Sequence, residues 1–112
     1  MDVIRKPITI HQLIGIAQDD LDEFNLYRKE DSPIDETSIL YLDDPIDVDD
    51  ETDEEIYPEF AKEHGLSIYF SGQVASDLIA NTRHQVKNPS LQDYIDNFNY
   101  YDKHDCFFTF SR

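Results

Sequence analysis

The side chains best suited to do chemistry in this sequence are the carboxylates of residues 43–55. Nine of these thirteen positions are Asp or Glu, and none is Lys, Arg or His. Carboxylates at such spacing suggest calcium binding, acid–base catalysis or attraction of a cationic partner. Like charges at this density destabilise a compact fold, because they repel one another. The run is therefore expected to be a solvated loop or a surface that a cationic molecule neutralises.

The run does not match a calcium-binding loop. An EF-hand needs oxygen ligands at positions 1, 3, 5, 7, 9 and 12 of the loop and glycine at position 6. A frame from Asp47 puts carboxylates at positions 3, 5, 7 and 9, but Thr52 at position 6 and Pro58 at position 12. A frame from Asp49 puts Phe60 at position 12. Beyond weak association of cations, the sequence predicts no metal and no cofactor.

No other residue pattern indicates an enzyme. His11, His64, His84 and His104 have neither the i, i+4 spacing nor the cysteine companions of a zinc site. Cys106 begins the apolar run Cys-Phe-Phe-Thr-Phe and is predicted to be a buried structural thiol. An acid–base pair needs two carboxyl groups in different environments, which a solvated run does not provide. We therefore predict a protein without catalytic activity.

The negative charge is concentrated in one half of the chain. The formal net charge is −16, and residues 19–59 hold eighteen acids and two cations, against six acids and five cations in residues 60–112. Such a surface repels nucleic acids and anionic membranes and attracts basic proteins. With 39% hydrophobic residues, including seven Phe and seven Tyr, the 112 residues are expected to fold as one domain over residues 1–112. The sequence shows neither a signal peptide nor an apolar run of about 20 residues, so we predict a cytoplasmic location.

Helices and strands alternate around the acidic run. Thr9 and Gln12 form a predicted capping box before a helix over Ile10 to Asp19, and Ser90 and Asp93 form a similar box before a helix with an apolar stripe. Further helices are predicted over residues 56–65 and 73–86, and strands over residues 24–29, 37–42, 66–70 and 106–110. The strand over 37–42 is apolar on both faces and is expected to be central. This order predicts an α+β domain, with a small, mostly antiparallel sheet packed by helices on one face.

Residues 90–108, Ser-Leu-Gln-Asp-Tyr-Ile-Asp-Asn-Phe-Asn-Tyr-Tyr-Asp-Lys-His-Asp-Cys-Phe-Phe, resemble a known pattern. An amphipathic helix that ends in Phe-Asn-Tyr-Tyr, followed by a short turn and an aromatic strand, is similar to the closing segment of small bacterial immunity proteins. These proteins accompany polymorphic toxins, including those of contact-dependent growth inhibition systems. Residues 37–42 match loosely and residues 43–55 not at all. The matching side chains look like fold determinants, so no active site carries over: Phe98, Asn99, Tyr100, Tyr101 and Asp105.

The resemblance implies a cytoplasmic protein that binds a toxin, and many such toxins are basic nucleases. We therefore predict an immunity protein that neutralises a cationic toxin domain and binds neither nucleic acid nor membrane. The expected contact residues are those of the acidic run and its two flanking tyrosines: Tyr41, Asp43, Asp44, Asp47, Asp49, Asp50, Glu51, Asp53, Glu54, Glu55 and Tyr57. Two alternatives stay open, a nucleic-acid mimic that inhibits a DNA-binding enzyme and a non-catalytic adaptor domain with a solvated acidic loop. The sequence carries no signal for an oligomeric state.

Overall fold

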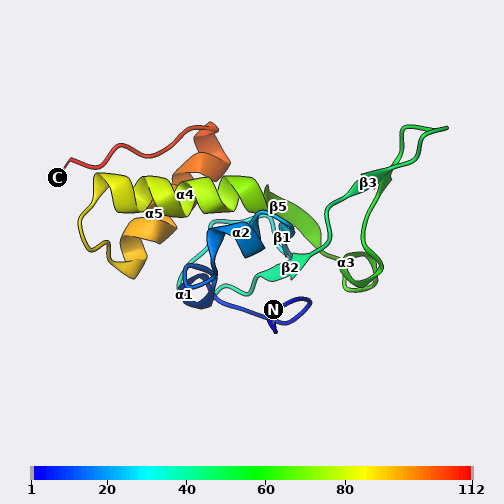
Figure 1. Cartoon of the computed structure of the whole chain (residues 1–112), viewed down its shortest axis with the longest axis horizontal. Coiled ribbons are helices and arrows are strands. Elements are labelled where there is room, and N and C mark those ends of the chain that lie inside the picture. The colour runs from blue at the N-terminus through cyan, green and yellow to red at the C-terminus, as the bar shows by residue number, and fades with distance from the viewer. Residues whose placement is uncertain (1, 112) are drawn as a thin grey trace.

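A three-stranded antiparallel sheet lies at the centre of the computed structural model, which describes residues 2–111. The middle strand is β1 (Asn25–Arg28), with β2 (Tyr41–Asp43) on one side and β5 (Ser67–Ser71) on the other (Figure 1). Both outer strands run antiparallel to β1. The predicted small antiparallel sheet is thus confirmed.

The remaining elements of residues 2–111 are five helices and a two-stranded hairpin, so the predicted α+β class is also confirmed. No helix among these residues is both long enough and apolar enough to cross a membrane. In chain order the elements are α1 (Ile10–Leu13), α2 (Gln18–Leu21), β3 (Asp47–Val48), β4 (Glu55–Ile56), α3 (Glu59–Glu63), α4 (Gly72–Gln85) and α5 (Leu91–His104).

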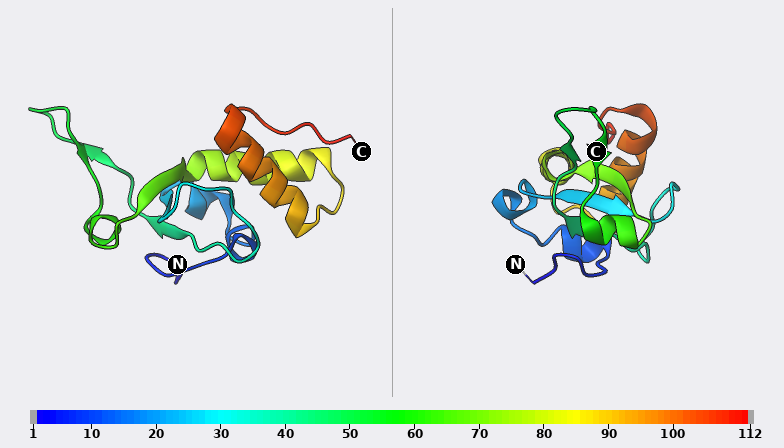
Figure 2. Two further views of the ribbon diagram at one scale, coloured as in Figure 1. Left: turned by 180° about the vertical axis from the view of Figure 1, so that it is seen from behind. Right: turned by 90° about the vertical axis from the view of Figure 1, so that its right-hand side faces the viewer.

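The main core lies between the sheet and the two long helices, α4 and α5 (Figure 2). Leu26 of β1 faces Leu42 of β2 and Phe70 of β5 in the strand register. Because paired residues point to the same face of a sheet, these three side chains form one apolar row. They pack with the buried side chains of Leu78 from α4 and Phe98 from α5.

A smaller cluster covers the opposite face of the sheet. Tyr27 points away from Leu26, because successive side chains of a strand alternate between the faces. It is buried together with Ala61 of α3 and Leu66, and the rings of Tyr57 and Phe60 pack around them. We predicted helices on one face only; α3 instead covers part of the second face.

The predicted helix over Ile10 to Asp19 is wrong, because the structure has two short helices there. The capping box at Thr9 is present, with Thr9 N donating to Gln12 Oε1 over 3.0 Å. Helix α1 ends after one turn, where Gly15 N and Ile16 N donate to carbonyls three residues back instead of four. Such bonds tighten the last turn of a helix, and glycine lowers its propensity to continue.

The predicted central position of residues 37–42 is wrong as well. The strand covers only Tyr41–Asp43, and β1 rather than β2 is the middle strand. On its far side, β2 and the residue before it meet the N-terminal segment in two single bridges, Ile4 with Leu42 and Ile8 with Leu40. Residues 40–42 are apolar because the N-terminal segment lies along one edge of this stretch and β1 along the other.

The predicted C-terminal strand is absent, and residues 105–111 form an extended tail along α4 and α5. Side-chain amides take the place of a neighbouring strand. The buried Asn97 Oδ1 accepts from Phe108 N over 2.9 Å, while Gln85 donates to Phe108 O over 2.7 Å and accepts from Phe110 N over 3.0 Å. Cys106 is exposed, which contradicts the predicted buried thiol.

Local signals at other helix ends match the structure. The capping box of α5 is complete, with Asp93 N donating to Ser90 Oγ over 3.2 Å and Ser90 N donating to Asp93 Oδ2 over 2.9 Å. Gly65 has a φ of 64° just after α3, as expected for the left-handed residue that ends a helix. The helix predicted over residues 56–65 is shorter in the structure: α3 covers Glu59–Glu63, Ile56 belongs to β4, and Pro58 precedes the first helical residue instead of occupying it.

Candidate functional site

The acidic run forms a projecting hairpin, which we call the acidic arm and define as residues 47–56. Strands β3 and β4 pair antiparallel, Asp47 with Ile56 and Val48 with Glu55. The arm extends away from the body of the protein at one end of its long axis (Figure 1). Every hydrogen bond of the arm in the described structure is internal to it. The predicted loop is therefore a hairpin held at its base alone.

Two acidic residues build the turn of the arm, Asp49 through its carboxylate and Asp53 through its backbone. Asp49 Oδ1 accepts hydrogen bonds from Glu51 N over 2.8 Å and Thr52 N over 3.2 Å. Asp53 N donates to the carbonyl of Asp49 over 2.9 Å, and Asp53 adopts a left-handed φ of 58°. Asp is among the few residues that tolerate this conformation and can bond its own backbone in a turn. Asp49 and Asp53 thus shape the tip as well as charging it.

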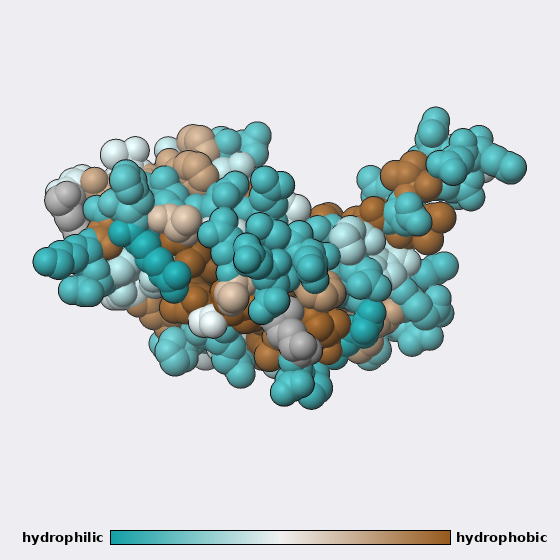
Figure 3. All heavy atoms as spheres, in the orientation of Figure 1, coloured by the Kyte–Doolittle hydropathy of each residue, from teal (hydrophilic) through white to brown (hydrophobic). Residues whose placement is uncertain are grey.

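The arm is both acidic and apolar. Seven of its ten residues are acids, and no ion pair among residues 2–111 involves them. Val48 and Ile56 are 50% and 48% exposed, and the space-filling view shows hydrophobic atoms among hydrophilic ones on the arm (Figure 3). Val48 pairs with Glu55 and Ile56 with Asp47, so the two apolar side chains point to opposite faces of the hairpin. The unpaired charges on this projection favour contact with an oppositely charged molecule.

The first carboxylate of the predicted contact set, Asp43, is unsuited to contact a partner. Its side chain is fully buried, and its Oδ1 lies 3.0 Å from Arg5 Nε and accepts from Asp44 N. Asp44 is exposed but also pairs with Arg5, over 3.1 Å. We therefore correct the predicted contact set by removing Asp43, which links the N-terminal segment to β2.

The two flanking tyrosines anchor the arm. Tyr41 and Tyr57 are both half-buried, Tyr41 with its ring 5.7 Å from that of Phe60 and Tyr57 with its ring 6.2 Å from that of Tyr27. Tyr27, which the sequence did not single out, donates from its hydroxyl to the carbonyl of Asp44 over 2.6 Å. Burial, with help from the nearby carboxylates, raises the pKa of Tyr27 to about 12. Tyr27 therefore holds the main chain where it leaves the sheet for the arm.

A hollow of about 460 Å³ lies where the arm meets the body, and we call it the crook. Its volume is within the range of ligand-binding clefts, and the cation among its lining residues is Lys62. The lining residues come from the arm, α3 and the start of β5: Glu54, Glu55, Ile56, Tyr57, Lys62, Leu66 and Ser67.

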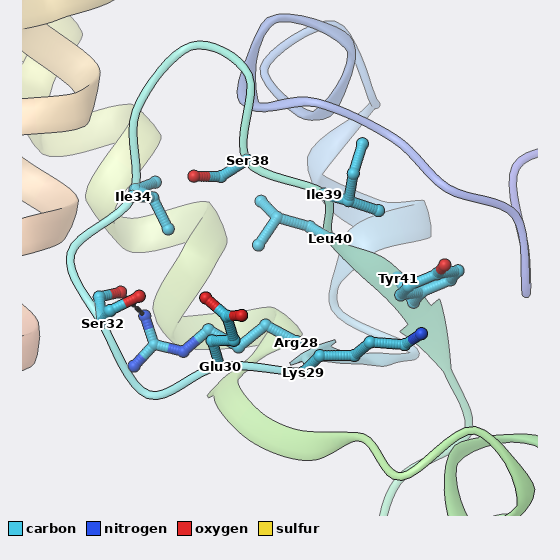
Figure 4. Close-up of a pocket in the computed structure, with 9 residues that line it drawn as sticks. All are labelled: Arg28, Lys29, Glu30, Ser32, Ile34, Ser38, Ile39, Leu40 and Tyr41. Atoms are coloured by element: carbon cyan, nitrogen blue, oxygen red, sulfur yellow. Dashed lines mark hydrogen bonds between the residues drawn. The ribbon is translucent and has the colours of Figure 1, made fainter.

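A second hollow, of about 340 Å³, lies between the end of β1 and the start of β2 (Figure 4). Arg28 lines it but is already satisfied, because its guanidinium donates to the Ser32 carbonyl and pairs with Asp31 and Asp102, each at 3.0 Å or less. It also lies 3.9 Å above the centre of the Tyr69 ring. Arg28 is therefore a structural residue, and this hollow has no unsatisfied charge except at its rim, on Lys29 and Glu30.

The described residues contain no group of three or more His, Cys, Asp or Glu side chains that could hold a metal ion. The four predicted surface histidines are exposed, and His64 stacks on Phe60 with ring centres 4.1 Å apart. The arm and the crook are the candidate functional site, because together they place carboxylates that are unpaired in the described structure beside a hollow.

Comparison with known proteins gives one match. A family model described as "Domain of unknown function (DUF7716)" matches residues 7–110. No curated protein and no solved structure matches the sequence.

Proposed function

The chain belongs to the DUF7716 family, a domain of unknown function. From its charge distribution and shape we propose that it is an immunity protein. It binds a cationic toxin domain such as a nuclease and neutralises it. The proposal depends most on the acidic arm, which places seven carboxylates away from the body. No cationic side chain of the described structure forms an ion pair with any of them. The resemblance of residues 90–108 to immunity proteins supports the same function.

The arm's geometry suits a partner that binds phosphate. A nuclease cleft is lined by cations, and carboxylates on a narrow hairpin can occupy the positions of phosphate groups in such a cleft. Charges at the end of a projection attract an oppositely charged protein before contact, which raises the association rate. Fast association is what an inhibitor needs when its target damages the cell at once.

The arm's stability also supports a role in binding. An isolated two-stranded hairpin is marginally stable in water, and repulsion among seven carboxylates weakens it further. A cationic partner removes that repulsion and covers Val48 and Ile56, so binding orders and stabilises the arm. Binding of a partner would explain why the chain has an arm whose residues contribute nothing to the core.

The proposal is tested by affinity purification of the tagged protein from its native cells at low salt. We expect one basic protein at close to one-to-one stoichiometry, which arrests growth when it is expressed alone and does not when this chain is expressed with it. Recovery of several unrelated basic proteins would favour the nucleic-acid mimic instead. Recovery of a bound protein that is harmless when expressed alone would favour an adaptor.

A further inference from the structure

We propose that the crook receives an extended basic segment of the partner, which pairs with the free edge of β5 as a fourth strand of the sheet. The inference rests on the proposed function for the identity of the partner, but its geometry comes from β5 and the crook alone. The extended sheet would have the order β2, β1, β5, partner.

The outer edge of β5 is unpaired. The strand is outermost in the sheet, and in the part of the chain that the structure describes, the main chain of residues 67–70 is hydrogen-bonded to β1 alone. The opposite edge of the sheet is covered, since Arg5 N donates to Leu42 O and Ile8 and Leu40 exchange two hydrogen bonds. One edge of the sheet is thus closed by this chain and the other is left open.

The sequence of β5 adds no charge to that edge, and the pairing of β5 with β1 shifts register at one irregularity, of the kind a β-bulge makes, between Leu26 and Tyr27. Edge strands of soluble proteins usually carry a charged residue or proline that prevents another strand from pairing with them. In this protein 30% of residues are charged, yet β5 reads Ser-Ile-Tyr-Phe-Ser, without a charge or a proline. Ile68 is also 40% exposed. An open, uncharged edge next to a hollow is the arrangement by which a sheet accepts an added strand.

The crook specifies what the added strand must look like. Its lining includes Ser67, the first residue of β5, and combines the apolar Ile56 and Leu66 with two carboxylates, Glu54 and Glu55, against one cation, Lys62. Side chains of a strand alternate between its two faces. The fitting segment therefore alternates apolar residues, directed toward Leu66 and Ile68, with Lys or Arg directed toward the arm. A second copy of this chain is a poor occupant, because each copy has a formal charge of −16.

The test uses the full chain labelled with ¹⁵N and an acetylated, amidated hexapeptide, Lys-Val-Lys-Val-Lys-Val. Its control is the same peptide methylated at every backbone nitrogen, which keeps the charges but cannot donate hydrogen bonds to β5. At low salt we expect the unmethylated peptide to bind at least ten-fold more tightly and to shift the amide signals of residues 67–71 and 54–57. Equal affinity of the two peptides, with shifts confined to residues 49–53, would overturn the inference, as would the absence of binding.

Two protein variants complete the test. Ile68→Ser removes the exposed apolar side chain of β5, and Ile39→Ser removes one of similar exposure, 46%, that lies outside β5. Ile68→Ser should weaken binding of the unmethylated peptide several-fold, and Ile39→Ser should leave it unchanged; equal effects contradict the proposal. The two proposals fail separately. A toxin that binds with shifts at the arm tip alone overturns strand addition, whereas peptide pairing with β5 in a chain that neutralises no toxin overturns the immunity function.

Discussion

Replacing Gly72 with alanine should destabilise the protein, although alanine is the better helix former. Gly72 is the first residue of α4, directly after β5, and its amide donates to the carbonyl of Phe24 over 2.7 Å. A Cβ atom at this position would lie 1.8 Å from the carbonyl oxygen of Leu21 and 2.2 Å from that of Phe24. Both contacts are with backbone, so no side-chain rotation relieves them.

The loss of stability expected for Gly72→Ala can be worked out from the backbone that must move to make room for the Cβ atom. The backbone of residues 21–24 must shift by roughly 1 Å from α4, and overpacking of this kind costs about 1–3 kcal/mol. The shift weakens the bond between Gly72 and Phe24 and the 2.8 Å bond from Ser76 Oγ to Asp22 Oδ1, at about 1 kcal/mol each. Helix propensity returns about 1 kcal/mol. We expect a net loss of about 2–4 kcal/mol from a free energy of unfolding of about 5–15 kcal/mol.

Urea unfolding followed by far-ultraviolet circular dichroism measures this loss. Gly15→Ala is the matched control, because the nearest atom to its new Cβ is Gln12 O at 3.5 Å, an ordinary contact. Gly15→Ala should leave the unfolding midpoint unchanged or raise it slightly. A midpoint for Gly72→Ala at or above that of the wild type, with the same dependence on urea, would refute the packing argument.

Three further predictions concern the tyrosines, the C-terminal tail and the arm. Burial raises the pKa of Tyr27 to about 12 and also raises that of Tyr69, so as the pH rises the unfolded chain loses these two protons before the folded chain does. The free energy of unfolding should therefore be constant from pH 8 to about 10 and then fall by up to about 1.4 kcal/mol per pH unit for each tyrosine. Urea unfolding at several pH values measures this fall, and Tyr27→Phe should show a shallower decline. Asn97→Ala removes three hydrogen bonds of a fully buried side chain and should lower the free energy of unfolding by about 2–4 kcal/mol, which is measured as a lower Tm. The control Gln92→Ala removes one exposed hydrogen bond and should lower it by less than about 0.5 kcal/mol. Replacing residues 47–56 by a short Gly-Ser turn should leave the free energy of unfolding within about 0.5 kcal/mol of the wild type, because no hydrogen bond joins the arm to the body in the described structure. A loss of about 2 kcal/mol or more would show instead that the arm stabilises the body.

The parts of the fold that the sequence predicts well depend on neighbours in the chain. The capping boxes at Thr9 and Ser90 and the left-handed Gly65 are set by residues within a few positions, and all three occur in the structure. The apolar stripes of α4 and α5 follow from helical periodicity in the same way. Local chemistry is sufficient to place these elements.

The errors arise where distant residues decide the outcome. Cys106 and the aromatic tail have the composition of a strand, but Asn97 and Gln85 on two helices supply the hydrogen bonds that a neighbouring strand would give. The middle position of β1 follows from its pairing with β2 on one edge and with β5 on the other, and β5 lies about forty residues further along the chain.

The candidate site shows the same division. The sequence identifies the acidic run by composition alone, and the structure adds which carboxylates are free. Asp43 is removed from the surface by Arg5, which lies near the N-terminus and has no sequence signal that links the two. Tyr27 holds the base of the arm through a backbone carbonyl, a contact that composition does not reveal.

Whether the acidic arm attracts the partner is measured most directly by the association rate of the recovered basic partner with two variants of this protein. In each variant, four carboxylates are neutralised. One carries Asp47→Asn, Asp50→Asn, Glu51→Gln and Glu54→Gln on the arm, which spares the turn-forming Asp49. The other carries Asp20→Asn, Glu23→Gln, Glu36→Gln and Asp77→Asn at exposed positions on the body. Both change the formal charge from −16 to −12, that is, −16 plus four.

Rates are measured by stopped flow at several salt concentrations, from about 20 mM to about 500 mM, over which the screening length falls from roughly 20 Å to roughly 4 Å. We expect the arm variant to associate several-fold more slowly than the wild type at low salt, with a difference that fades at high salt. The body variant should associate at a rate close to that of the wild type. Indistinguishable rates for the arm and body variants would contradict this expectation, because the charge of the whole molecule rather than the acidic arm would then attract the partner.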